Sequence, residues 1–219
     1  MKKRTIFALL LVGILAYAAT FPNQKNAIQG ATPDFQLIKK KSKFKNRKKF
    51  DLRETIPCKF EDYQAMTRVE FNRLGLPLKA RKTLLHRESF KEDFFYYYAF
   101  QENLNGNYGI VILSCIEGMG NELTCLVFSK YGTYLGGETL AYNGGDMDMV
   151  WNMKGTFSKG GKYNFEYDKY LGNKDQVCEW YKASFRFGED GQISRSDTVY
   201  RVKEDPNVPC YEKKFKKKN

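Results

Sequence analysis

The sequence predicts a mainly β protein. We expect an antiparallel meander of about eight strands, forming a barrel or a strongly curled sheet, with a short N-terminal helical element. From about residue 93, apolar residues alternate with polar ones, the period of strands. Short links rich in glycine and asparagine recur about every ten residues, and no βαβ pattern appears. The 219 residues are 42% hydrophobic and 16% aromatic, which is enough for a real core in one domain.

Three rows of large apolar side chains define the later strands. The rows are Met147, Met149, Trp151, Met153 and Phe157; Tyr163, Phe165 and Tyr167; and Tyr181, Ala183, Phe185 and Phe187. Successive side chains of a strand point to opposite faces, so each row occupies one face. Residues 108–116 are apolar on both faces, as in a covered central strand. We expect strands at 93–102, 107–117, 122–130, 133–142, 147–157, 161–169, 177–188 and 192–202.

A helical element is expected before the sheet. Residues 60–73 have apolar side chains at roughly helical spacing, and Gly75 and Pro77 stop the pattern. Residues 78–86 form a second candidate helix. We therefore expect these helices to cap or flank the sheet.

The N-terminus has the features of a secretory signal peptide. Met1 to Arg4 is basic, Ile6 to Ala16 is apolar, and Ala16-Tyr17-Ala18 offers a cleavage site. Residues 1–18 are thus predicted to be removed, leaving a secreted or periplasmic protein with no transmembrane span; an uncleaved N-terminal anchor is the alternative. No cysteine lies near the site, so no lipoprotein is expected.

The net charge of +12 is concentrated near the two ends of the chain. We expect a flexible basic leader at 19–49, a single β-rich domain at 50–212 with a charge of −4, and a basic tail at 213–219. The residues expected to contact an anionic envelope surface are Lys39, Lys40, Lys41, Lys43, Lys45, Arg47, Lys48, Lys49, Lys213, Lys214, Lys216, Lys217 and Lys218. A solubilising spacer is the alternative, and the scarcity of stacking aromatics in these runs argues against nucleic acid.

Several segments of the β region carry a resemblance. A hydrophobic strand is followed by LVFSKYGTYLGG, a glycine-rich break, WNMKGTF and a late GEDGQI. This succession, over about residues 93–195, resembles exported β-rich proteins of unknown function from Bacteroidota-type bacteria. The resemblance implies the compartment and the fold, and it brings no activity and no catalytic residues.

Five cysteines leave at least one thiol outside any set of disulfides. If residues 119–121 form a hairpin loop, Cys115 lies opposite Cys125, within disulfide range. Cys58 and Cys210 bracket the folded body and form the second possible pair. The alternative is that all five are buried small hydrophobic residues.

Aromatic residues are the candidates for recognition. Phe95 and Tyr97 lie on one face of a strand that has rings on both faces, so they are exposed unless the helix at 60–73 covers them, the alternative that we favour. Trp180 shares a face with Lys182 and Arg186 and is the better candidate for a surface contact. Catalytic, metal and cofactor sites are not expected, since there is one histidine and no nucleotide or hydrolase motif.

We therefore expect an exported, non-enzymatic cell-envelope protein. It would bind a ligand or partner (an unknown protein, a glycan or a small molecule) through its sheet, with the basic segments aiding attachment. The first alternative is a secreted hydrolase with an unpatterned carboxylate site. The second is a protein inhibitor or an adhesin-like module.

Overall fold

A computed structural model describes residues 32–52, 62–85, 94–116, 120–146, 149–171 and 176–201. All of them belong to one compact unit, Ala31–Asn219. The predicted signal peptide, the basic tail with Lys213 to Lys218, and the Cys58–Cys210 pair lie outside the described residues.

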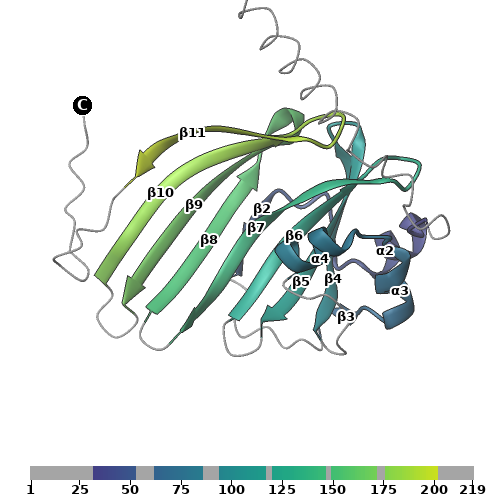
Figure 1. Ribbon diagram of the computed structural model, residues 1–219, viewed down its shortest axis with the longest axis horizontal. Coiled ribbons are helices and arrows are strands. Elements are labelled where there is room, and N and C mark those ends of the chain that lie inside the picture. The colour runs from purple at the N-terminus through teal and green to yellow at the C-terminus, as the bar shows by residue number, and fades with distance from the viewer. Residues whose placement is uncertain are drawn as a thin grey trace, which may run out of the picture. The chain divides into compact units, whose positions relative to one another are not determined.

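The unit is built on one large sheet whose main part is a meander of eight long strands (Figure 1). These are β4 (Phe95–Leu104), β5 (Asn107–Ile116), β6 (Gly120–Phe128), β7 (Tyr134–Asp146), β8 (Met149–Phe157), β9 (Lys162–Leu171), β10 (Gln176–Phe187) and β11 (Ile193–Arg201). Consecutive strands pair antiparallel in chain order. Each lies within a few residues of a predicted strand, so the mainly β prediction is confirmed. Among the described strands, β1 and β11 stand at the two ends of the order and do not pair with each other, so the sheet is curled rather than closed.

Three short strands were not predicted and bring the total to eleven. They are β1 (Phe44–Lys45), which pairs parallel with β4, β2 (Lys49–Asp51), which pairs with β8, and β3 (Gln64–Ala65), which pairs with β4. The parallel β1 makes the sheet mixed.

The predicted flexible leader is corrected by the structure over residues 34–49. Helix α2 (Phe35–Lys41) has Asp34 as its N-cap, and the Asp34 carboxylate accepts a hydrogen bond from the Leu37 amide. Strands β1 and β2 follow the helix. The like charges do not unfold this segment, because Lys39 pairs with Glu102 and Lys41 with Glu70. The folded body therefore begins well before residue 50.

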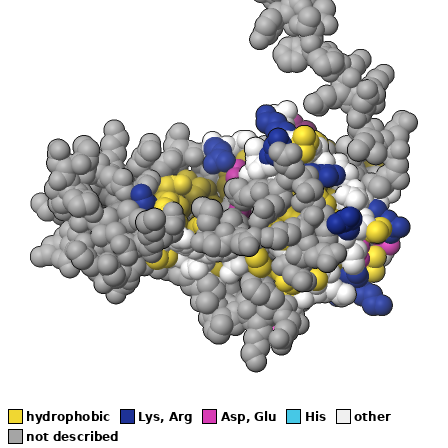
Figure 2. Space-filling model, turned by 60° about the horizontal axis from the view of Figure 1, so that its bottom comes forward, with side chains coloured by type: hydrophobic (Ala, Val, Ile, Leu, Met, Phe, Trp, Pro, Cys, Tyr) yellow, Lys and Arg dark blue, Asp and Glu magenta, His cyan; other side chains and the backbone are white. Residues whose placement is uncertain are grey.

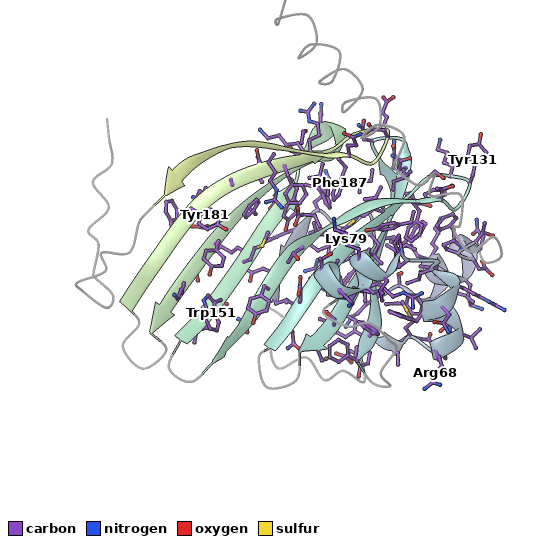
Figure 3. All side chains as sticks on the ribbon, in the orientation of Figure 1. Arg68, Lys79, Tyr131, Trp151, Tyr181 and Phe187 are labelled. Atoms are coloured by element: carbon purple, nitrogen blue, oxygen red, sulfur yellow. The ribbon has the colours of Figure 1, made fainter. Side chains whose placement is uncertain are left out.

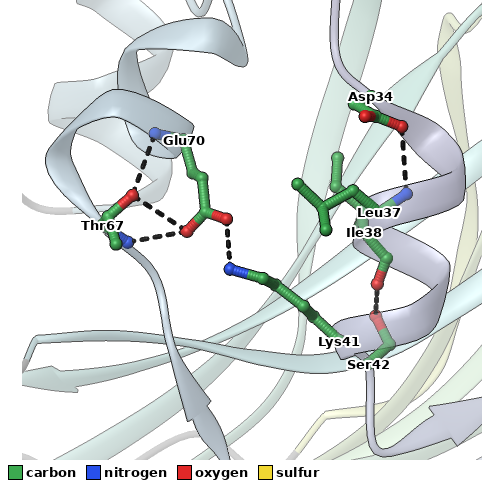
Figure 4. Close-up of polar contacts among 7 residues, drawn as sticks. All are labelled: Asp34, Leu37, Ile38, Lys41, Ser42, Thr67 and Glu70. Carbon is green, nitrogen blue, oxygen red and sulfur yellow. Dashed lines mark hydrogen bonds and ion pairs between the residues drawn. The ribbon is translucent and has the colours of Figure 1, made fainter.

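Helices α3 (Arg68–Arg73) and α4 (Leu78–Leu84) confirm that helices precede the sheet, although the first begins later than predicted. Thr67 caps α3 in a capping box: its hydroxyl accepts from the Glu70 amide, and the Glu70 carboxylate accepts from the Thr67 amide. Figure 4 shows that the same carboxylate reaches Lys41 of α2. One glutamate thus joins two helices.

The helices cover one face of β4–β6, and a first hydrophobic core lies between them (Figure 1). The Phe71 ring of α3 stacks on the Phe95 ring of β4, with centroids 4.9 Å apart and planes 16° apart. The buried members of this core are Ile38, Met66, Phe71, Leu74, Leu76, Leu85, Phe94, Phe95, Tyr97, Phe100, Ile110, Ile112, Leu126 and Phe128.

A second core joins the opposite face of β4–β6 to the aromatic face of β8–β10. This is possible because β7 and β8 pair over only five residues of each, Tyr142–Asp146 with Met149–Met153. Beyond that point β8 pairs instead with β2. Phe50 of β2 is fully buried, and its ring contacts those of Tyr98, Phe157 and Tyr163. Phe50, the first residue of the predicted domain, therefore belongs to this core, and Phe44, from the segment before it, packs against the same core.

Side chains fasten the sheet to itself at one end. Asn105 lies in the β4–β5 turn, and its side-chain amide donates a hydrogen bond to the Phe187 carbonyl (3.0 Å). Asn107 lies beside the turn, and its side-chain amide donates to the Glu189 carbonyl (2.9 Å). Gly191 of the β10–β11 turn has a φ of +77°, and a Cβ there would lie 2.1 Å from the Leu135 Cβ. These contacts hold the last hairpin against the β4–β5 turn and against β7.

Candidate binding surfaces

The three aromatic rows lie side by side on one face of β8–β10. The register places Phe157 opposite Tyr163 and Tyr163 opposite Phe185. Further along, Met153, Tyr167 and Tyr181 are aligned in the same way. Cross-strand neighbours share a face, so the predicted alternation is confirmed and the rows form one surface.

Burial changes along this surface. Tyr163 and Phe185 are buried, and the Tyr163 hydroxyl donates to the Leu140 carbonyl (2.5 Å). Towards the β7–β8 and β9–β10 connections most of the side chains become half-buried, and the first polar residue of the rows is Lys169, opposite Trp151. We call this end the aromatic surface; it comprises the half-buried Trp151, Met153, Tyr167 and Tyr181 and the adjoining Phe165, which is buried.

Ring contacts order the aromatic surface. The rings of Tyr167 and Tyr181 lie 5.0 Å apart, and the ring of Phe165 lies 6.1 Å from that of Tyr181 in an edge-to-face contact. Figure 3 shows Trp151 and Tyr181 on a part of the sheet away from α2, α3 and α4. Large rings held in fixed positions suit the stacking of a flat apolar group. The sequence pattern identifies these residues, but it does not show at which point along the strands the side chains cease to be buried.

A polar strip lies in the same cross-strand row as Met153 and Tyr167. The row continues through Tyr142 to Glu122 and then to Ser114. Glu122 is buried and accepts hydrogen bonds from the Thr139 and Thr124 hydroxyls. Burial and the nearby Glu122 carboxylate raise the pKa of Tyr142. Polar groups thus separate the helix-covered core from the aromatic surface.

Glu138 is a second carboxylate on β7. Burial raises its pKa, and the neighbouring Arg195 guanidinium, whose Nη2 lies 2.5 Å from Glu138 Oε2, partly offsets this shift. The contact joins β7 to β11. Both carboxylates, Glu122 and Glu138, are therefore engaged in contacts within the fold.

Trp180, Lys182 and Arg186 share the other face of β10, as predicted from their spacing. The Trp180 indole N–H donates to Glu166 Oε1 (2.6 Å), and the Lys182 ammonium lies 5.2 Å from the Trp180 ring centroid. Lys154 Nζ lies 3.6 Å from the second Glu166 oxygen. Trp180 is half-buried in this network, while Lys182 and Arg186 are exposed. Their role in binding stays a prediction.

Phe95 and Tyr97 are not exposed, which corrects their prediction as ligand contacts. Both are buried in the first core under the helices, as the favoured alternative predicts. The Tyr97 hydroxyl donates to Glu70, and burial together with that carboxylate raises the pKa of Tyr97.

The predicted basic contacts between Lys39 and Lys49 divide into two groups. Lys39, Lys41 and Lys43 pair with Glu102, Glu70 and Asp62, and the Arg47 guanidinium lies 4.1 Å from the centroid of the Phe44 ring. Lys40, Lys45, Lys48 and Lys49 are exposed, as is the paired Lys43.

The predicted Cys115–Cys125 disulfide is wrong. The β5–β6 register places Cys115 opposite Asn121 and Cys125 opposite Val111, so the two residues are not cross-strand partners. Cys125 is buried, which raises the pKa of its thiol. It packs as a small hydrophobic residue, as the alternative predicts.

Within the described ranges no group of three or more His, Cys, Asp or Glu residues could hold a metal ion. In the same part of the chain, no helix has the length and apolar character needed to span a bilayer. Fold and surfaces define the class: a mainly β protein with one large curled sheet, a helical layer and an aromatic surface. Comparison with protein-family models, curated proteins and solved structures found no match.

Proposed function

We propose that this chain is an exported, non-enzymatic envelope protein that binds a flat apolar ligand, or an apolar segment of a partner, on its aromatic surface. The observation that carries the proposal is the loss of burial along the ladder of rings. Tyr163 and Phe185 are enclosed, whereas Tyr167 and Tyr181 are half-buried with the same spacing and on the same face.

The energetics favour binding at this end of the sheet. Covering exposed apolar surface is worth roughly 25 cal/mol per Å², and a favourable aromatic contact adds about 0.5–1.5 kcal/mol. The rings of Phe165, Tyr167 and Tyr181 already contact one another, so a ligand needs to order few side chains.

The two tryptophans allow a direct test, because they lie on opposite faces of the sheet. In the Trp180→Phe variant, Trp151 is the sole tryptophan and reports on the aromatic surface. The neutral apolar fluorophore N-phenyl-1-naphthylamine is titrated into this variant, and energy transfer from tryptophan is measured. We expect saturable transfer, which weakens about tenfold with Tyr181→Ser, a loss of about 1.4 kcal/mol.

Two controls sharpen the assay. The Trp151→Phe variant leaves Trp180 as the reporter on the polar face, and transfer there should be smaller. Arg186→Ser removes an exposed side chain from the same strand but from the other face, so it should leave the affinity unchanged. Saturable binding that is insensitive to Tyr181→Ser would refute the proposed site.

The envelope location is supported by the N-terminal sequence, and attachment to an anionic surface by the exposed lysines of residues 40–49. Recovery of the protein from cell fractions tests this part. Cleavage after Ala18, measured by intact mass, is the expected result.

A further inference from the structure

Charge is strongly segregated within the described part of the chain. Residues 32–52 and 62–85, which form α2–α4 and the short strands, carry 13 Lys and Arg against 4 Asp and Glu, a net charge of +9. The described residues from 94 to 201 carry 9 against 10, a net charge of −1. The excess positive charge of the described residues therefore lies on the helical layer and the strands beside it.

Many basic side chains of this layer lie at the surface, and acidic residues contact some of its cations. Glu70 and Asp62 pair with Lys41 and Lys43, and Asp34 caps α2. The exposed basic residues are Lys40, Lys43, Lys45, Lys48, Lys49, Arg68, Arg73, Lys79 and Lys82. Four of these, on α3 and α4, lie outside the basic segments that the sequence singles out.

Large apolar side chains protrude among these cations. Val69 of α3 is 58% exposed and Leu78 of α4 is 55% exposed, and a link of only four residues, 74–77, joins the two helices. The one other large hydrophobic residue that is strongly exposed in the described chain is Tyr131, in the β6–β7 turn. Figure 2 shows hydrophobic side chains beside Lys and Arg on the surface of the unit.

We propose that the helical layer is a docking surface for an anionic phospholipid bilayer, with Arg68, Arg73 and Lys79 against the headgroups and Val69 and Leu78 entering the interface. Basic residues alone would fit any polyanion, but exposed apolar side chains beside them match the interfacial region of a bilayer. The inference gives a lipid partner to the anionic attachment proposed above, and it is independent of the aromatic surface.

Vesicle flotation of the purified full-length chain tests the proposal, using phosphatidylglycerol/phosphatidylcholine vesicles and pure phosphatidylcholine vesicles. We expect binding to the anionic vesicles only, and weaker binding as the salt concentration rises. The triple variant R68Q/R73Q/K79Q should bind about 100-fold more weakly, a loss of about 3 kcal/mol at about 1 kcal/mol per basic residue. V69S/L78S should also weaken binding.

Matched controls replace exposed residues in β10 and in the connections between the long strands. K130Q/K159Q/R186Q removes the same charge, and Y131S removes an exposed hydrophobic residue; both should bind as the unchanged chain does. An equal loss in the two triple variants would overturn the docking surface, because it would show that net charge alone governs binding. Full binding by V69S/L78S, or preference for single-stranded RNA over vesicles in a competition, would overturn the bilayer as the partner.

The aromatic surface has a separate readout. If vesicle binding fails while energy transfer from Trp151 to N-phenyl-1-naphthylamine persists, only the lipid inference is lost. If vesicle binding persists while energy transfer from Trp151 fails, the proposed apolar ligand site is refuted and the docking surface is retained. Circular dichroism of each variant verifies the fold, which substitutions at exposed positions should preserve.

Discussion

The ion pair between Lys41 and Glu70 offers a quantitative test of how the N-terminal segment is held on the sheet. Glu70 accepts hydrogen bonds from the Lys41 ammonium, the Thr67 amide (2.9 Å) and the Thr67 hydroxyl (3.0 Å). The Tyr97 hydroxyl of β4 also donates to it. Removing either charge should therefore loosen the contact between α2, α3 and the sheet.

The size of the effect follows from the burial of the pair. Side-chain exposure is 18% for Lys41 and 11% for Glu70, so the pair is mostly shielded from water. Two unit charges about 4 Å apart attract by about 4 kcal/mol at an effective dielectric constant of 20, and desolvation cancels a large part of this. We expect Glu70→Gln and Lys41→Met each to reduce the free energy of unfolding by about 2 kcal/mol.

The pH dependence has a definite sign. Burial alone raises the pKa of Glu70, but the hydrogen bonds from Lys41 and Thr67 outweigh it and hold the pKa below the ordinary value of 4.5. The unfolded chain therefore binds this proton more readily than the folded protein does. The stabilisation is complete above the ordinary pKa and is lost as the pH falls through the lowered folded value.

Urea denaturation followed by circular dichroism, at pH 7 and at a series of acidic pH values, measures both effects. The double variant Lys41→Met/Glu70→Gln completes a double-mutant cycle, and a coupling energy of about 1–2 kcal/mol is expected at pH 7. Lys40→Met is the matched control, because Lys40 is exposed on the same helix. A coupling energy near zero, or a difference between wild type and Glu70→Gln that grows on acidification, would refute the reasoning.

Four further substitutions test the packing. Phe50→Ala empties a fully buried aromatic site and should reduce the free energy of unfolding, measured by urea denaturation, by about 3–5 kcal/mol; an unchanged free energy would show that β2 does not pack in the core. Gly155→Ala would place a Cβ 2.5 Å from the Tyr163 ring and should lower the thermal midpoint through a loss of about 1–3 kcal/mol. Tyr163→Phe deprives the Leu140 carbonyl of its donor and should cost about 1 kcal/mol of unfolding free energy. Asn107→Ala should speed amide hydrogen exchange in the β10–β11 turn, because its amide holds the Glu189 carbonyl; unchanged exchange would argue against this contact.

The meander could be predicted because its signals are local. Alternating apolar residues place each strand, and positive-φ turn residues such as Asn105 and Gly106 separate them. The same local signals did not determine the register of the β5–β6 hairpin. Residues 118–121 offer several loop positions, and the register observed, with Ser114 opposite Glu122, moves Cys115 away from Cys125.

Helix α2 was missed for the opposite reason, since its stability depends on distant residues. The composition of residues 39–49 predicts repulsion, but the compensating Glu70 and Glu102 lie far along the chain. A local signal was nevertheless present in Asp34, a good N-cap residue just before the helix. Likewise Thr67 and Glu70 have the spacing of a capping box, which places the start of α3 later than apolar spacing alone suggests.

The candidate sites show the same division between local and distant information. Spacing correctly places Trp180 with Lys182 and Arg186, and it correctly groups the rows that contain Tyr167 and Tyr181. Spacing does not show that Trp180 is held by Glu166 of the neighbouring strand. Nor does it show that the rows with Tyr167 and Tyr181 extend beyond the core. Exposure depends on which elements reach a given face.

Strand β2 links the fold to the proposed sites. Its three residues take the place of β7 beside the later part of β8, and this lets β7 and β8 diverge. The divergence encloses one end of the aromatic ladder around Phe50 and leaves the other end half-buried. The same N-terminal segment carries α2, which adds its lysines to the helical layer. The end of the segment predicted as a flexible basic leader, together with the two residues that follow it, thus determines both where the core ends and where the basic surface lies.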